Sequence, residues 1–465
     1  MQTKAERSRL IVNVWTARII PLVLTGVVGY ATYVLVVLLC VKYLLVKHDD
    51  KRAAIPILVV YFILFLLMAS SFFRTLYITT FDPPYLPLGD GAHDKRNNAQ
   101  SGGNGDIEMQ GPEYHPTPGQ QPGAGPNNYA APGLEKFYTK EVFRVETDGK
   151  PRWCSQCCNW KPDRTSHCSD AGRCIYKMDH FCPWVGGPVG ESNFKFFVQF
   201  TAYTALYCTH LLIVMSFYIH RQIKSPDEKY ERQFAAIIGL AGFFGLFTGA
   251  MTGTNIPLVI GNVTQVENLN VRSAIFNLAV LVPARDELVQ ISPEAASRNR
   301  YPTITYPLST PPPSQDTNEA PATTTHAHVQ LSIPIPLGGQ QHTSIESSSS
   351  RDLKATRTFA ILHTQPGDNP WDLGSAYLNW QALMGISVLD WFLPIRRSPC
   401  CNHDNPESYY ALGPAVDLLR ASMLFIRPDQ IRLKRPHFQP NVHKNRIRSG
   451  SNSRPSNAEE LRRLR

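Results

Sequence analysis

Four long stretches of this 465-residue chain contain no Asp, Glu, Lys or Arg. They are mostly apolar, 19 to 27 residues long, and cover residues 19–41, 55–73, 196–219 and 234–260. A helix needs about 20 apolar residues to cross the hydrocarbon core of a bilayer. Buried helices of a large soluble core are the alternative, but they rarely run this far without a charge. The sequence therefore predicts an α-helical polytopic membrane protein with four transmembrane helices.

Ionisable side chains are also scarce inside these stretches, where His210 is the only Asp, Glu, Lys, Arg or His. A channel or transporter keeps such groups along its pathway, so this function class is disfavoured. A cleaved signal peptide is an alternative for the first stretch. That stretch is too long for a signal-peptide core and no clear small-residue cleavage site follows it. We expect it to remain as a helix.

The orientation of the helices is poorly marked by charge, because Lys and Arg are nearly balanced across the short loops. Four spans put both termini and the long second loop on the same side. Residues 427–465 carry eleven Lys or Arg against three acids, which contributes to the net charge of +9. This basic tail fits contact with anionic lipid headgroups or simple solvation better than nucleic acid binding. With the cysteine pattern below, it favours a cytosolic side for the termini.

Composition divides the rest of the chain into segments. Gly, Pro, Asn and Gln are concentrated between the second and third stretches, and Ser, Thr, Pro and Gln after the fourth, which is typical of disorder. An apolar and aromatic island around "NPWDLG" is too short to span and predicts a docking segment. The expected order begins with an N-terminus at 1–18, a helical hairpin at 19–80 with its second helix to about 75, and a disordered linker at 81–135. A cysteine-rich domain at 136–195 and a second helical hairpin at 196–262 follow. The C-terminal region at 263–465 is expected to be disordered at 286–366 and to dock on the protein at about 369–400.

The fourth stretch contains glycine at every fourth position, Gly245, Gly249 and Gly253. This small-xxx-small spacing lets helices approach closely. We favour helix packing over a direct role in ligand binding.

Cysteine is rare outside residues 154–182, which hold six of the ten. A CxxC pair followed within about 20 residues by further Cys and His fits a tetrahedral zinc site. Disulfides are the alternative and would require an oxidising compartment. Zinc beside a free thiol requires a reducing one, which favours the cytosol. The cluster runs directly into the third apolar stretch at "NFKFF", so any site built on it lies at the membrane surface.

Residues 154–197, from "CSQCCNWKPDRTSHC" through "KMDHFCPWVGG" to "NFKFF", closely resemble the cysteine-rich domain of DHHC-type protein S-palmitoyltransferases. The motif here is Asp-His-Phe-Cys. "DPP" at 82–84 stands where the family usually has Asp-Pro-Gly, and "NVTQVE" at 262–267 where it usually has Thr-Thr-x-Glu. "NPWDLG" resembles C-terminal segments of fungal members. The four apolar stretches flank the domain in the family's order.

The resemblance implies two interleaved zinc sites of three cysteines and one histidine each. The positions of the first fall on Cys154, Cys157, His167 and Cys174, and all four are ligands. The positions of the second fall on Cys168, Ala171, Phe181 and Pro188, of which three are not. We therefore expect one structural zinc, with apolar packing in place of the second. Rescue of the second zinc by Cys158 or another neighbour is the alternative.

The resemblance also implies that Cys182 is the nucleophile, His180 the activating base, and Asp179 the group that orients His180. The chemistry agrees with these roles. A free thiol has a pKa of about 8.5, which a neighbouring His lowers. Residues two apart in an extended segment project to the same face. A carboxylate on the far ring nitrogen stabilises the imidazolium.

By this resemblance the protein transfers palmitoyl from palmitoyl-CoA to cysteine thiols of membrane-associated proteins, through an acyl-Cys182 thioester. The acyl chain is expected in a cavity among the four helices. Arg164 is our candidate for the CoA phosphates. Thr264 and Glu267 are expected to support the active site, although Gln265 replaces a family Thr.

Two other function classes compete with this reading. A zinc-binding ubiquitin-ligase module needs two zincs and no reactive cysteine, which the emptied second site disfavours. A catalytically inactive, membrane-anchored zinc-binding scaffold would keep the fold without the chemistry. Cys400 and Cys401 are either structural thiols or acylation sites, and the sequence does not choose between them.

Overall fold

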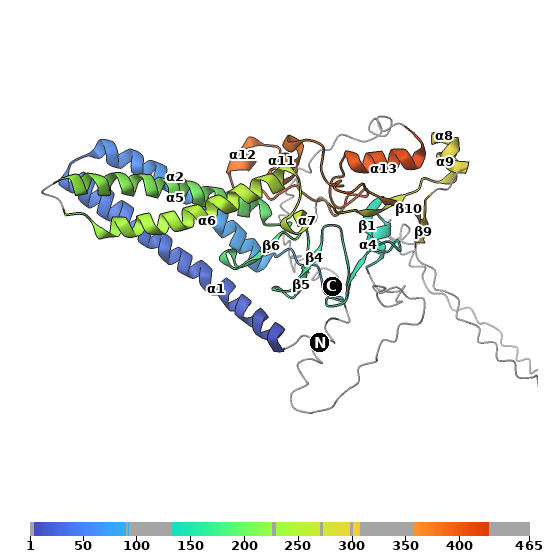
Figure 1. The fold of residues 1–465 in the computed structure, drawn as a ribbon, viewed down its shortest axis with the longest axis horizontal. Helices are drawn as coiled ribbons and strands as arrows, with labels where there is room; N and C mark the ends of the chain where they lie inside the picture. The colour runs from blue at the N-terminus through green and yellow to red at the C-terminus, as the bar shows by residue number, and fades with distance from the viewer. Residues whose placement is uncertain are drawn as a thin grey trace, which may run out of the picture.

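The structure is a computed structural model, and it describes residues 4–89, 92, 133–225, 229–269, 273–297, 301–306 and 357–426. Four long helices lie side by side at one end of the molecule (Figure 1). The hairpins of the cysteine-rich domain lie at one end of this bundle, and a β-sheet lies farther from it (Figure 1).

The helical bundle confirms the four predicted transmembrane helices. The first consists of α1 (Lys4–Thr32), which continues as the π-helix η1 (Tyr33–Lys47). The others are α2 (Lys51–Phe81), α5 (Phe194–Lys224) and α6 (Arg232–Ile260). All four are long and apolar enough to cross a membrane. Each helix extends past the uncharged stretch that predicted it, because flanking charged residues can still be helical where water begins.

Only one of the three spaced glycines in α6 makes a close helix contact. A Cβ added to Gly245 would lie 3.0 Å from the Cβ of Cys208 on α5, whereas one added to Gly249 or Gly253 would meet nothing within 4 Å. The helix-packing prediction therefore holds at Gly245, where the absent side chain lets α5 and α6 approach.

A four-stranded antiparallel sheet lies beyond the bundle, and the sequence did not predict it. Its strands follow the order β1 (Val142–Val145), β8 (Asn277–Leu281), β10 (Arg357–His363) and β9 (Thr303–Tyr306). Alternate residues of β8 and β10 pack into two apolar clusters, one on each face. A strand buried on both faces shows no alternation of apolar and polar residues, and the paired strands of this sheet are far apart in the chain. For these two reasons the sequence did not indicate the sheet.

The prediction of disorder over residues 286–366 is therefore wrong at both ends. Residues 285–297 form α8 (Arg285–Ile291) and α9 (Pro293–Ser297), and β9 and β10 join the sheet. Ser, Thr and Pro dominate the average composition and hide these short apolar runs. The middle of that segment lies outside the described residues, as do most of the predicted linker and the basic tail.

The predicted docking segment forms α11 (Ala376–Met384) and α12 (Val388–Phe392), followed later by α13 (Pro414–Leu424). Side chains of α5 donate hydrogen bonds to the backbone of this segment. Gln199 bonds the carbonyl of Trp391 at 2.9 Å, and Lys195 that of Arg396 at 3.0 Å. The segment thus docks on the protein at the start of α5, beside the cysteine-rich domain.

Candidate active site and metal centre

The cysteine-rich domain folds as three two-stranded hairpins. They are β2 (Arg152–Cys154) with β3 (Asn159–Lys161), β4 (Ser166–Cys168) with β5 (Arg173–Ile175), and β6 (His180–Cys182) with β7 (Gly187–Val189). Each strand has three residues, and isolated hairpins of this size are not stable in water. The domain therefore needs cross-links between its hairpins.

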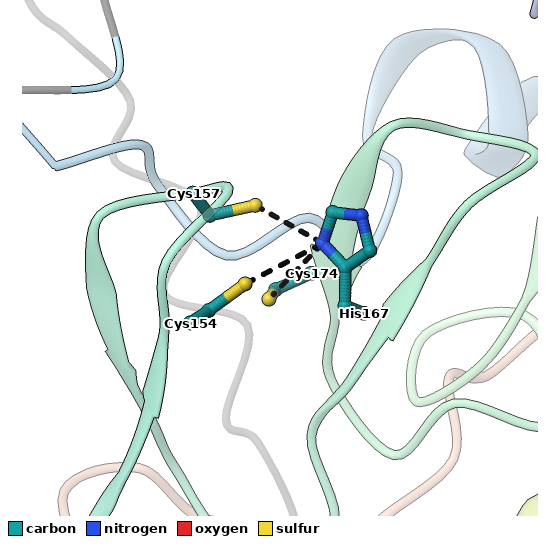
Figure 2. A group of neighbouring side chains, drawn as sticks. All are labelled: Cys154, Cys157, His167 and Cys174. Carbon is teal, nitrogen blue, oxygen red and sulfur yellow. Dashed lines mark hydrogen bonds between the residues drawn. The ribbon is translucent and has the colours of Figure 1, made fainter. Parts of the chain in front are cut away.

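The first two hairpins bring together all four predicted zinc ligands (Figure 2). His167 and Cys174 face each other across β4 and β5, and the other hairpin presents Cys154 and Cys157. The Nδ1 atom of His167 lies 3.5 Å from the sulfur of Cys154, 3.4 Å from that of Cys157 and 3.8 Å from that of Cys174.

These distances fit a tetrahedral zinc ion. With Zn–S of about 2.3 Å and Zn–N of about 2.0 Å, tetrahedral geometry separates sulfur and nitrogen by about 3.5 Å. The three cysteines are buried, as in closed structural sites. We call these four residues the Cys3His cluster.

The second zinc site that the resemblance implies has a different environment. Phe181 and Pro188 lie directly opposite each other in the β6–β7 hairpin, where cross-strand neighbours pack together. Within the described part of the chain, Cys168 belongs to no group of three or more metal-ligating side chains. Phe181 and Pro188, at two positions of the second family site, are thus paired with each other and offer no metal-ligating atom.

Asp179, His180 and Cys182 come together at the third hairpin. The Nδ1 atom of His180 lies 2.7 Å from Oδ2 of Asp179, which is 2% exposed. His180 and Cys182 are in the same short strand, so their side chains project to one face. The ring of His180 packs edge-on against Phe197 of α5, and Cys182 is buried in an apolar cluster between α5 and α6.

The electrostatics of His180 favour its charged form. Burial lowers the pKa of His180, but the hydrogen bond to Asp179 and the nearby Cys182 thiol raise it, and the result is about 9. The raised pKa makes His180 a stronger acceptor for the proton of the adjacent thiol, and the imidazolium that results stabilises a thiolate.

The short helix α7 (Gln265–Asn268) orients Asp179 through its backbone. Thr264 caps this helix, and Glu267 completes a reciprocal capping box with it. The backbone N–H of Gln265 donates to Oδ1 of Asp179 at 2.8 Å. The replacement of a family Thr by Gln265 thus leaves this contact intact, because no side-chain atom of residue 265 makes it.

Arg164 is part of the same support rather than of an open surface. Its guanidinium is 1% exposed and pairs with both carboxylate oxygens of Glu267, at 2.9 and 2.6 Å. It also donates to Asn262 and stacks on Trp371. Every side of the group contacts protein, and this geometry gives no support to the predicted contact with CoA phosphates.

An apolar cavity of about 580 Å³ opens among the four long helices. Its lining is largely aliphatic and aromatic and comes from all four. Phe72 and Phe200 line the cavity and also pack against the apolar cluster that contains Cys182. The cavity and the thiol are therefore neighbours.

Sequence reasoning missed Asn193, which is fully buried at the start of α5. Its amide donates to the carbonyl of Pro188 at 2.9 Å and to the hydroxyl of Thr79 on α2 at 3.0 Å. It thereby ties the third hairpin to the helical bundle. In the sequence it appears only as the first residue of "NFKFF", which belongs to the family resemblance but received no role there.

A membrane helix bundle with a Cys3His cluster and a thiol–imidazole–carboxylate set beside an apolar cavity defines a membrane-bound thiol acyltransferase. The family model described as DHHC palmitoyltransferase matches residues 147–272. This chain belongs to the DHHC palmitoyltransferase family and is an enzyme of protein S-palmitoylation.

Particular relatives extend the match to nearly the whole chain. Palmitoyltransferase pfa5 of Aspergillus fumigatus is 38% identical over 441 residues, which cover 88% of this chain and 90% of the relative. Palmitoyltransferase pfa5 of Emericella nidulans is 36% identical over 436 residues, or 88% and 86% of the two chains. Human palmitoyltransferase ZDHHC3 is 40% identical over 124 residues, or 25% and 42%.

Proposed function

We propose that this palmitoyltransferase takes palmitoyl from palmitoyl-CoA onto Cys182 and passes it to a cysteine thiol of a membrane-associated protein. The observation that carries the proposal is the hydrogen bond of 2.7 Å between Asp179 and His180. Cys182 lies two residues after His180 in the same strand, so its side chain is on the same face. Thiol nucleophiles are activated by such an oriented base.

In the first half-reaction, His180 takes the proton of Cys182. The hydrogen bond to Asp179 stabilises the resulting imidazolium. The thiolate attacks the carbonyl carbon of the acyl-CoA thioester, and a new C–S bond to Cys182 forms. The C–S bond to CoA breaks, and CoA leaves as a thiol with the proton that His180 returns.

In the second half-reaction, the thiol of the protein substrate gives its proton to His180. Its sulfur attacks the acyl carbon on Cys182, the C–S bond to Cys182 breaks, and the proton returns to Cys182. Because the first product leaves before the second substrate reacts, we expect ping-pong kinetics.

The acyl chain has an apolar place next to this thiol. The cavity of about 580 Å³ among α1, α2, α5 and α6 supports its binding there, since each methylene removed from water contributes about 0.8 kcal/mol.

We infer that the Cys3His cluster holds the one zinc of the two family positions, and that this zinc is structural. It would hold together hairpins that are too small to fold alone. Zinc beside a free nucleophilic thiol requires a reducing compartment. We therefore place the cysteine-rich domain and both termini in the cytosol, against the lipid surface.

The experiment is labelling of the purified full-length protein with an alkyne analogue of palmitoyl-CoA. We expect a label on the chain that hydroxylamine removes, because hydroxylamine cleaves thioesters. Cys182→Ser should take up none. The control is Cys158→Ser, which removes a partly exposed thiol of the same domain and should label like the wild type.

Two outcomes would contradict the proposal. One is a folded wild type that takes up no label, as an inactive zinc-binding scaffold would behave. The other is equal labelling of Cys182→Ser, which would assign the acyl group to another thiol.

A further inference from the structure

A second group of metal-ligating side chains lies outside the positions that the family resemblance assigns. It consists of Glu191, Cys401 and His403, which we call the second cluster. Their donor atoms all lie within 4.8 Å of one another, and Oε1 of Glu191 is 2.9 Å from Nε2 of His403. Glu191 is far in the chain from Cys401 and His403, so only the fold brings the carboxylate to the other two.

Glu191 is held firmly in this cluster. It stands between β7 and α5, where its N–H donates to the carbonyl of Tyr176 at 3.0 Å. Its second carboxylate oxygen accepts a hydrogen bond from the hydroxyl of Tyr410. Such outer hydrogen bonds fix the orientation of a metal ligand.

The loop that carries Cys401 and His403 is held as well. The ammonium of Lys140 donates to the carbonyls of His403, at 2.7 Å, and Asn405, at 2.6 Å. The ring of His403 packs edge-on against Tyr176 at 5.2 Å between ring centres. The donors are thus arranged before any ligand arrives, which lowers the entropy cost of binding.

The donor set suits zinc. A thiolate, an imidazole and a carboxylate are the three side-chain ligands that zinc uses in proteins. The thiolate selects against magnesium and calcium, which prefer oxygen alone. One thiolate and one carboxylate together balance the charge of a divalent ion.

The cluster differs from the closed Cys3His cluster in its exposure. The side chain of His403 is 40% exposed and that of Glu191 12%. A site with three protein ligands and an open side completes its shell with water. The neighbouring thiol of Cys400 donates to the backbone carbonyl of Glu191 at 3.7 Å and hydrogen-bonds the thiol of Cys401, but its sulfur is not one of the three clustered donor atoms.

We propose that Glu191, Cys401 and His403 bind a second zinc ion at a position of this chain's own. Glu191 follows Pro188, one of the emptied family positions, by three residues. The metal would tie the C-terminal loop to the end of the β6–β7 hairpin and so cross-link the part of the domain that lacks the family's second zinc. The zinc content of the whole chain then becomes two, one more than the family positions alone provide.

The test is the zinc content of the purified full-length protein after zinc loading and desalting. We expect two zinc ions per chain for the wild type. Cys401→Ser, His403→Ala and Glu191→Gln should each hold one. Cys400→Ser is the matched control, because it changes the adjacent thiol outside the donor set, and it should hold two.

A wild type with one zinc would overturn the proposal. A wild type with two zincs that Cys401→Ser and His403→Ala both retain would also overturn it, and would instead place the second metal near Cys168. Cys182→Ser should keep both ions, so failure of the proposed acyl transfer is read separately from failure of this site.

Cobalt titration of the wild type keeps the proposal testable if the variants fail to fold. We expect two equivalents to bind, the second with a weaker thiolate charge-transfer band, because the second cluster has one thiolate and the Cys3His cluster has three. Saturation at one equivalent would contradict a second site.

Discussion

Phe181 stands between His180 and Cys182 in the sequence, yet it does not interrupt them in space. Successive side chains of a strand point to opposite faces, so Phe181 lies on the face away from both, and it is paired with Pro188. Phenylalanine at this position offers no metal ligand, and it leaves His180 and Cys182 on one face of the strand.

Asp179 controls the charge of His180 at the scale of a single hydrogen bond. In Asp179→Asn the pKa of His180 should fall below about 9, because the carboxylate that raises it is gone. The thiolate of Cys182 loses its imidazolium neighbour at neutral pH. We expect acylation of Cys182 at pH 7 to fall about 10²- to 10⁴-fold.

The measurement is the pH profile of Cys182 alkylation, followed on its peptide by mass spectrometry. Its midpoint should move to higher pH in Asp179→Asn. Asp170→Asn, which changes an exposed carboxylate of the same domain, is the control and should leave the profile in place. An unchanged profile in Asp179→Asn would refute the pairing.

Arg164 is predicted to act through stability. Arg164→Met leaves the carboxylate of Glu267 buried without its partner, which typically costs about 3–5 kcal/mol. The thermal midpoint should fall strongly, whereas Arg396→Ala, in which an exposed ion pair is lost, should change it little. If Arg164→Met is stable and has a raised KM for palmitoyl-CoA, the result would instead support the predicted contact between Arg164 and the CoA phosphates.

At the scale of elements, the active site depends on how a short helix meets a hairpin. Helix α7 offers a backbone N–H to Asp179, and Glu267, the glutamate of its capping box, pairs with Arg164. The carboxylate is thus oriented by main-chain geometry, which tolerates changes of side chain.

Two substitutions of Gln265 separate the contribution of its side chain from that of its backbone N–H. Gln265→Ala keeps the N–H and should acylate like the wild type. Gln265→Pro removes it, while the helix is preserved, because proline is favoured at the first helical position and Thr264 before it is already extended. A hydrogen bond to a charged group contributes about 1.5–3 kcal/mol, so we expect roughly a 10- to 100-fold loss of Cys182 labelling. Equal rates for the two variants would exclude the backbone contact from the mechanism.

At the scale of the whole molecule, the helical bundle supplies the cavity and the cysteine-rich domain supplies the thiol. Neither part is complete alone, because Asn193 ties the third hairpin to α2. The docked C-terminal segment contacts both α5 and Glu191, which follows that hairpin.

Cavity length should therefore set the preferred acyl chain. Ala241 lines the cavity and is buried, so Ala241→Leu should shorten the available space. Exclusion of two methylenes forgoes about 0.8 kcal/mol each, which corresponds to roughly a tenfold shift from palmitoyl toward myristoyl in competitive labelling. Gly249→Leu, on the same helix and open to space, should leave the preference unchanged. A changed chain-length preference in Gly249→Leu but not in Ala241→Leu would contradict the assignment of this cavity to the acyl chain.

The sequence by itself determined the four membrane helices, the four residues of the Cys3His cluster and the position of the cysteine-rich domain between the second and third helices. These depend on local features: uncharged length, CxxC spacing, and a contiguous motif that carries its own resemblance. Only the tertiary structure decided the sheet, the burial of Arg164 and the second cluster of Glu191, Cys401 and His403. Each of these joins residues far apart in the chain, and no local pattern records which distant partner a buried strand, a cation or a thiol will meet.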